Sequence, residues 1–202
     1  MRIFGFAGYS GAGKTTLIEQ LIPRFCRMGL RVSLIKHAHH EFDIDKPGKD
    51  SFRHREAGAG EVMVVSTRRW ALMHELRNEP EPSLDEQISH MSPCDLLLVE
   101  GFKSSHIPKM EIYRSALGKA RLQCEGMNIV ALASDGASNV QEAVAVPQLD
   151  LNNPDEVAGF ILEYFRIDPR QVVFPARTVA STMPTMQVAA TPANVALSHR
   201  FL

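Results

Sequence analysis

The sequence predicts an α/β protein in which a mostly parallel β-sheet carries helices on both of its faces. Short apolar runs alternate with amphipathic stretches over most of the 202 residues. One run, DLLLVEG at residues 95–101, has four successive apolar residues, as expected of a strand buried on both faces. The first run, at residues 2–7, leads directly into the glycine-rich stretch GYSGAGKTT at residues 8–16. Together these observations predict a sheet that begins with a strand, a loop and a helix.

The remaining elements follow from local patterns in chain order. Strands are expected at residues 2–7, 31–36, 61–66, 70–76, 95–101, 109–114, 129–135 and 146–150, and helices at 15–28, 83–91 and 154–167. The strands at 61–66 and 70–76 are separated by a short basic turn, so they are expected to form a hairpin. Asp50 or Ser51 is expected to cap a further short helix that runs to Ala57.

The glycine-rich stretch matches the phosphate-binding pattern G-x-x-x-x-G-K-[ST] at Gly8, Gly13, Lys14 and Thr15. Its glycines, Gly11 included, let the backbone turn tightly, so that successive N–H groups face an anion at the start of the next helix. Lys14 is expected to contact the β- and γ-phosphates, and to be exposed when the loop is empty. The Thr15 hydroxyl is suited to bind Mg²⁺. The alternative is a glycine-rich turn with a solvated lysine.

The carboxyl ends of parallel strands form the ligand-binding edge of such a sheet. Glu100 ends the most apolar strand, so it is the candidate acid beside Mg²⁺; the alternative is a carboxylate that closes a turn. Lys103 follows it and is a candidate phosphate ligand, or a solvated lysine. Asp135 ends the run IVALAS and is expected either to read a base or to close a turn. The Asn-Lys-x-Asp sequence that reads guanine in many GTP-binding proteins does not occur in this chain.

The stretch at residues 36–59 is dense in charge and holds four of the eight histidines: His37, His39, His40 and His54. Three interpretations stay open for the first three: a Zn²⁺ or Ni²⁺ site, a site for an anionic substrate, or a solvated loop. Basic residues in the same stretch, Lys46, Lys49, Arg53 and Arg55, favour an anion. Five acidic residues lie among them, which argues against a nucleic-acid surface.

The composition is that of an ordinary soluble protein, with 45% apolar residues, 22% charged residues and a net charge of −1. This balance gives no reason to expect nucleic acid or a membrane as a partner. Three cysteines without a C-x-x-C pair predict reduced thiols in the cytoplasm. Residues 169–202 contain no Asp or Glu, so we expect a domain over residues 1–167 and a dispensable tail or linker over residues 168–202.

The chain resembles the molybdopterin-guanine dinucleotide biosynthesis protein B family in three stretches: FAGYSGAGKTTL, IKHAHHEFDIDKPGKDSFRHREAGA and DLLLVEGFK. The stretch ALASD gives weaker support. The resemblance covers residues 1–167. It implies a P-loop NTPase fold, GTP binding with weak hydrolysis, and a homodimer. It also implies an adaptor role in molybdenum cofactor biosynthesis, beside the guanylyltransferase that attaches GMP to molybdopterin.

The resemblance carries over residue by residue. It implies that Gly11, Gly13, Lys14, Thr15 and Thr16 hold phosphate and Mg²⁺, and that Asp50 and Glu100 are the acids near the metal. The expected catalytic set is Lys14, Asp50 and Glu100, and the expected metal ligands are Thr15, Asp50 and Glu100. The expected nucleotide-binding set is Gly8, Ser10, Gly11, Ala12, Gly13, Lys14, Thr15, Thr16, Lys36, His37, Lys103 and Asp135.

Two other functions stay open beside a GTP-binding adaptor. A small-molecule kinase would use a lid of arginines, for which Arg53, Arg55, Arg68 and Arg69 are candidates. A GTPase metallochaperone would need a Cys/His metal motif and the guanine signature, and the sequence contains neither.

Overall fold

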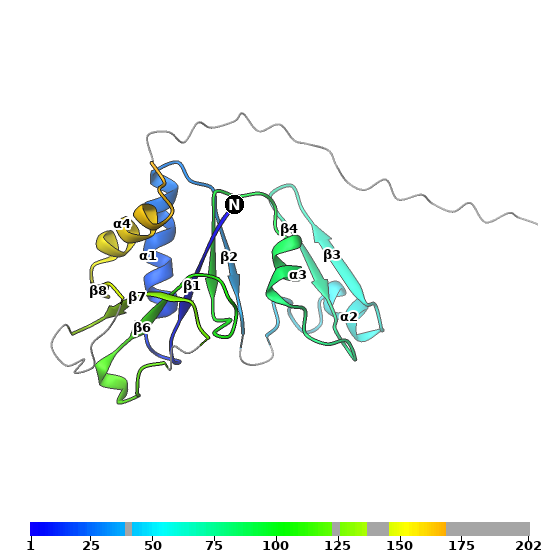
Figure 1. Ribbon diagram of the computed structural model, residues 1–202. Helices are drawn as coiled ribbons and strands as arrows, with labels where there is room; N and C mark the ends of the chain where they lie inside the picture. Colours follow the sequence, from blue (N-terminus) through cyan, green and yellow to red (C-terminus); the bar gives the residue numbers. More distant parts are fainter. Residues whose placement is uncertain (39–41, 123–125, 137–145, 169–202) are drawn as a thin grey trace, which may run out of the picture. The chain divides into compact units, whose positions relative to one another are not determined.

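The structure, a computed structural model, describes residues 1–38, 42–122, 126–136 and 146–168. Its centre is a six-stranded, wholly parallel sheet in the order β2-β5-β1-β6-β7-β8 (Figure 1). The strands are β1 Arg2–Ala7, β2 Val32–Lys36, β5 Leu96–Glu100, β6 Lys109–Tyr113, β7 Ile129–Ser134 and β8 Gln148–Asp150. The predicted parallel α/β architecture is confirmed.

Strand β5 is buried along its whole length between β1 and β2, as its apolar sequence predicts. Its last residue, Glu100, pairs in register with Lys36 of β2 and Phe6 of β1. Because all three strands run in the same direction, their carboxyl ends meet at one edge of the sheet. The register therefore places the Glu100 carboxylate close to the loop that follows β1.

Helices cover both faces of the sheet, as predicted. Helices α1 (Lys14–Arg27) and α4 (Pro154–Tyr164) lie side by side on one face (Figure 1) and pack against Phe4, Phe6 and Leu98. The short helix α3 (Leu84–Ser89) packs on the other face.

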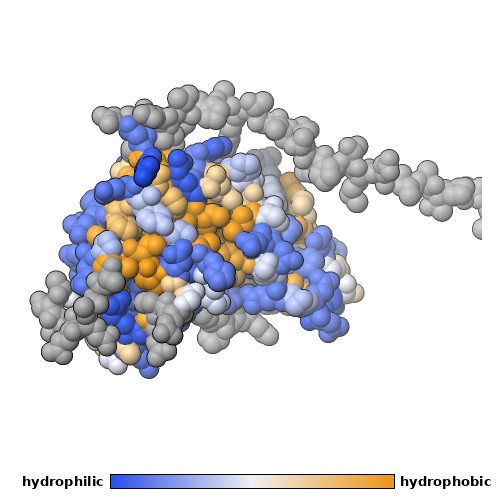
Figure 2. Space-filling model, in the orientation of Figure 1, coloured by the Kyte–Doolittle hydropathy of each residue, from blue (hydrophilic) through white to orange (hydrophobic). Residues whose placement is uncertain are grey.

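Figure 2 shows a continuous apolar area in the middle of the view, bordered by hydrophilic side chains. Among the described residues, no helix has both the length and the apolar character needed to cross a bilayer.

The bounds of several elements differ from those expected, and two of the differences concern helix ends. Helix α2 (Asp50–Glu56) follows Lys49 at its N-cap, so Asp50 is its first helical residue and the expected cap is wrong. Helix α4 ends at Tyr164 instead of residue 167, since Arg166 has a left-handed backbone with φ of 51°. Of the predicted tail, all but Asp168 lies outside the described residues.

The predicted hairpin forms a separate two-stranded antiparallel sheet of β3 (Glu61–Val65) and β4 (Trp70–His74). Its turn is closed by a 2.8 Å hydrogen bond from the Ser66 N–H to the Arg69 carbonyl. Several of its large apolar side chains are exposed, including Val65 at 68% and Trp70 at 63%. Exposed apolar side chains on a two-stranded sheet are a surface that a partner can cover.

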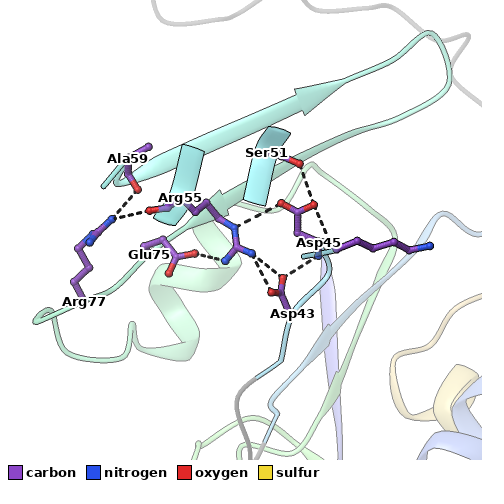
Figure 3. Close-up of polar contacts among 8 residues, drawn as sticks. Asp43, Asp45, Ser51, Arg55, Ala59, Glu75 and Arg77 are labelled. Atoms are coloured by element: carbon purple, nitrogen blue, oxygen red, sulfur yellow. Dashed lines mark hydrogen bonds and ion pairs between the residues drawn. The ribbon is translucent and has the colours of Figure 1, made fainter. Parts of the chain in front are cut away.

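Arg55 of α2 is the centre of an ion-pair cluster (Figure 3). Its Nη2 donates to both Asp43 carboxylate oxygens at 3.0 Å, its Nη1 donates to Glu75 at 2.7 Å, and its Nε lies 3.7 Å from Asp45. The Arg55 side chain is only 13% exposed. Since its guanidinium already faces three carboxylates, Arg55 does not fit the lid arginine that a kinase would need.

Candidate functional site

The loop after β1 requires glycine for two separate reasons. A Cβ atom on Gly8 would lie 2.5 Å from the Ile112 carbonyl oxygen, which is closer than any real contact. Gly13 has a left-handed backbone with φ of 99°, which a side chain would strain. Gly13 is also the N-cap of α1, and within the described part of the chain no side chain caps that helix. The N–H groups of its first turn are therefore the kind of donors that bind an anion.

A hollow of about 790 Å³ opens above this loop at the carboxyl edge of the sheet. It is lined by Ser10, Gly11, Gly13, Lys14, Thr15, Thr16, Lys36, His37, Ala38, Phe42, Glu100, Gly101 and Lys103. The lining includes three lysines and one carboxylate. This balance of charge suits a polyphosphate.

Lys14 lies within the hollow, but not as expected. Its Nζ donates to the carbonyl oxygens of Gly8 at 3.1 Å and Tyr9 at 2.9 Å, and the side chain is half-buried. Burial lowers the Lys14 pKa, and the negative charge of Glu100 opposes that shift. The expectation of an exposed side chain is wrong, because the loop carbonyls hold the ammonium group against the loop.

Thr15 and Glu100 are brought into direct contact. The Thr15 hydroxyl donates to Glu100 Oε1 at 2.7 Å, and Lys36 Nζ lies 3.4 Å from Oε2 of the same carboxylate. The Glu100 side chain is 7% exposed, so its position is fixed by the strand beneath it. A hydroxyl and a carboxylate at this spacing are hard oxygen ligands of the kind that Mg²⁺ binds alongside phosphate and water.

Two predicted acids lie elsewhere. The Asp50 side chain is 89% exposed and lines a different hollow beside α2 and β3, so the structure does not bring it together with Thr15 and Glu100.

Asp135 Oδ1 accepts hydrogen bonds from the N–H and the hydroxyl of Ser115, at 3.0 and 3.2 Å. The Ser115 N–H is the main cause of a lowered Asp135 pKa. Of the two interpretations of Asp135, these contacts favour the one in which it closes a turn.

The histidine stretch is described in part. His37 lines the hollow, with Nε2 2.9 Å from Glu81 and its ring 4.9 Å from the Phe102 ring. His39 and His40 lie outside the described residues. Within the described ranges, no group of three His, Cys, Asp or Glu side chains is arranged to hold a metal ion. Lys103 Nζ lies 5.1 Å from the centre of the Tyr9 ring, beside the loop.

One residue of this region was missed by the sequence reasoning. The Arg114 guanidinium lies beside the loop, with Nη2 3.3 Å from the position that a Cβ on Gly13 would take. Arg114 directly follows β6, so the rule that ligands bind at the carboxyl ends of parallel strands was a signal that could have found it.

Comparison with known proteins identifies the family. The family model MobB, described as molybdopterin guanine dinucleotide synthesis protein B, matches residues 3–135, which run from β1 past the end of β7. The chain belongs to the MobB family. The family expected from the three sequence stretches is thereby confirmed.

Two relatives within the MobB family are similar over most of their length. The molybdopterin-guanine dinucleotide biosynthesis adapter protein of Escherichia coli (strain K12) is 42% identical over 167 residues, which cover 81% of this chain and 93% of the relative. The protein with the same name from Haemophilus influenzae is 40% identical over 162 residues, covering 79% of this chain and 86% of the relative.

Solved structures of MobB proteins share the fold. Bacillus subtilis MobB superposes with a TM-score of 0.64 at 24% identity and covers 81% of this chain and 97% of its own. A MobB homologue from Bacillus stearothermophilus superposes with a TM-score of 0.61 at 24% identity, covering 83% of this chain and all of its own.

Proposed function

We propose that this MobB chain is a nucleotide-gated adaptor that assists the attachment of GMP to molybdopterin. In this proposal it binds GTP with Mg²⁺ and works beside the molybdopterin guanylyltransferase in the cytoplasm. The observation that carries the proposal is the contact between Thr15 and Glu100 beside Lys14, at the start of α1. The relatives in Escherichia coli and Haemophilus influenzae, both named as adapter proteins, support the adaptor role.

The arrangement suits a nucleoside triphosphate with its metal. The backbone N–H groups of the loop bind the phosphates, and the Lys14 ammonium binds oxygens of the β- and γ-phosphates. Thr15 and Glu100 hold Mg²⁺, directly or through water. The metal neutralises charge on the terminal phosphates when it is bound. Lys36 and Lys103 add positive charge around the same hollow.

GTP is proposed as the nucleotide on the strength of the family. Both relatives are named for a guanine dinucleotide, so a guanine nucleotide is the form their pathway uses. We propose at most weak hydrolysis by the chain alone, because tight ground-state binding of a triphosphate does not by itself speed phosphoryl transfer. The ion pairs of Arg55 also remove one candidate for an arginine that contacts the transferring group.

A second copy of the chain is the proposed partner for the hairpin. Met63, Val65 and Trp70 expose 53%, 68% and 63% of their surface, and the two strands form a sheet with no third strand among the described residues. A two-stranded sheet gains little stability alone. Covering these side chains in a homodimer would remove apolar area from water.

The metal assignment is tested by titrating the chain with GTP in the presence and absence of Mg²⁺. We expect Glu100→Gln to weaken the Mg²⁺-dependent part of binding by about 10- to 100-fold, as loss of a metal-supporting carboxylate does. The matched control is Asp50→Asn, since Asp50 is exposed and lines the other hollow. It should keep the Mg²⁺ dependence of the wild type. A loss of Mg²⁺ dependence in Asp50→Asn, with none in Glu100→Gln, would contradict the proposal that Glu100 supports the metal.

A further inference from the structure

Arg114 lies on the side of the phosphate loop opposite to Glu100. Strand β1 lies between β5 and β6 in the sheet. Strand β5 ends in Glu100, and Arg114 directly follows β6. The loop follows β1 between them. The Arg114 guanidinium approaches Gly13, with Nη2 3.3 Å and Nε 3.9 Å from the Cβ position of that glycine. The loop is therefore flanked by a carboxylate on one side and a guanidinium on the other.

A short chain of hydrogen bonds orients this guanidinium. Arg114 Nη1 donates to Asp135 Oδ2 at 3.3 Å, and Asp135 Oδ1 accepts from the N–H and hydroxyl of Ser115. The Asp135 side chain is 15% exposed, whereas that of Arg114 is 36% exposed. The partly buried carboxylate thus holds one end of the guanidinium, and the Nη2 end faces the loop.

A small hollow opens at this place. It measures about 140 Å³ and is lined by Gly13, Thr16, Leu17, Gln20, Arg114, Leu151 and Asn152. Gly13 and Thr16 also line the large hollow, so the two share the last part of the loop. The small hollow is well below the size of a pocket that encloses a whole small molecule, but it is large enough for a phosphate group.

The direction of the nucleotide follows from the metal side. If Thr15 and Glu100 hold Mg²⁺, the β- and γ-phosphates would lie toward β5, because the ion would neutralise charge on those groups. The α-phosphate then lies further along the loop, at Gly13 and Thr16, on the side of β6. An arginine at that place can offer two parallel N–H groups to a phosphate.

We propose that Arg114 binds the α-phosphate of the nucleotide and that Asp135 is the residue that positions it. This proposal rests on the proposed function, since it needs a nucleotide on the loop. It gives Asp135 an indirect part in nucleotide binding, through the orientation of Arg114, in place of direct contact with a base. The alternative is an ion pair that only ties the end of β6 to the end of β7.

The test is calorimetric titration of the full chain with GTP and with GDP in the presence of Mg²⁺. Both nucleotides carry the α-phosphate, so Arg114→Ala should weaken both by the same factor, about tenfold or more. A contact with the γ-phosphate would weaken GTP alone, and a contact with the β-phosphate would leave the affinity for GMP, titrated in parallel, unchanged. Arg114→Lys keeps a positive charge near Asp135 but loses the planar fork, so a smaller equal loss is expected. Asp135→Asn should also weaken both nucleotides equally, by less than Arg114→Ala.

Three results would overturn the assignment. If Arg114→Ala and Arg114→Lys both bind GTP and GDP with wild-type affinity, the ion pair between Arg114 and Asp135 has only a structural role. A loss confined to GTP would place Arg114 at the γ-phosphate. A wild-type chain that binds neither GTP nor GDP would overturn the proposed function itself, and this proposal with it, which separates the two failures. The melting temperature of each nucleotide-free variant controls for loss of folded protein.

Discussion

Replacing Lys14 with alanine is expected to weaken GTP binding by about 100-fold or more and to leave the chain folded. The Lys14 ammonium is held over the phosphate loop by the Gly8 and Tyr9 carbonyls, so it is in place to meet phosphate oxygens. Removing it takes a positive charge out of a hollow that is proposed to bind phosphate through positive charge. The Gly8 and Tyr9 carbonyls lose one hydrogen-bond donor, which water can replace because the hollow is open.

The measurement is titration calorimetry with GTP and Mg²⁺, together with a thermal melt of the nucleotide-free variant. Lys46→Ala is a matched control, since Lys46 is an exposed lysine that lines the hollow beside α2 and not the one above the loop. We expect it to bind GTP as the wild type does. Unchanged affinity in Lys14→Ala, with a normal melting temperature in both variants, would contradict the assignment of the loop.

The second large effect is expected in stability. Arg55→Ala should lower the melting temperature by on the order of 5 °C, because it removes the guanidinium that faces the clustered carboxylates of Asp43, Asp45 and Glu75. The Asp45 side chain is only 10% exposed and would lose this ion pair. Arg53→Ala on the same helix is the control, since the Arg53 side chain is 74% exposed and its distance to Asp50 is 3.7 Å. Equal melting temperatures of the two variants would show that the cluster does not stabilise the fold.

The same cluster predicts a pH dependence. The Asp43 pKa is held below its usual value of 3.8, chiefly by the Asp45 N–H and further by Arg55. A carboxylate with a lowered pKa stabilises the folded chain above its unfolded pKa and loses that contribution as the pH falls through the lowered value. The difference between wild type and Arg55→Ala should therefore be full at pH 7 and shrink below about pH 4.

The sheet and the core of the site could be predicted because they depend on local patterns. Glu100 follows four apolar residues of one strand, and Lys14 and Thr15 lie in a spacing that the phosphate loop requires. The rule that ligands bind at the carboxyl edge then brings these residues together without knowledge of strand order. The contact between Thr15 and Glu100 is what that rule implies.

Three features could not be found in this way. Arg114 lies beside Gly13 only because β6 is the neighbour of β1, and strand order is not encoded in the spacing of residues along the chain. Asp50 lies in another hollow because the stretch before α2 is fixed by the Arg55 ion pairs, which follow no helix or strand period. The half-buried state of Lys14 depends on carbonyl groups, which every residue has and no sequence pattern marks.

The most direct test of the adaptor proposal measures the affinity between this chain and the molybdopterin guanylyltransferase of the same organism, with the guanylyltransferase immobilised. Binding is measured without nucleotide, with GTP and Mg²⁺, and with GTP and Mg²⁺ using the Lys14→Ala variant. If a nucleotide on the loop gates the adaptor, GTP should change the affinity of the wild-type chain and leave that of Lys14→Ala unchanged. The same affinity in all three conditions would contradict the proposal, because partner binding would then be independent of the loop at residues 8–16.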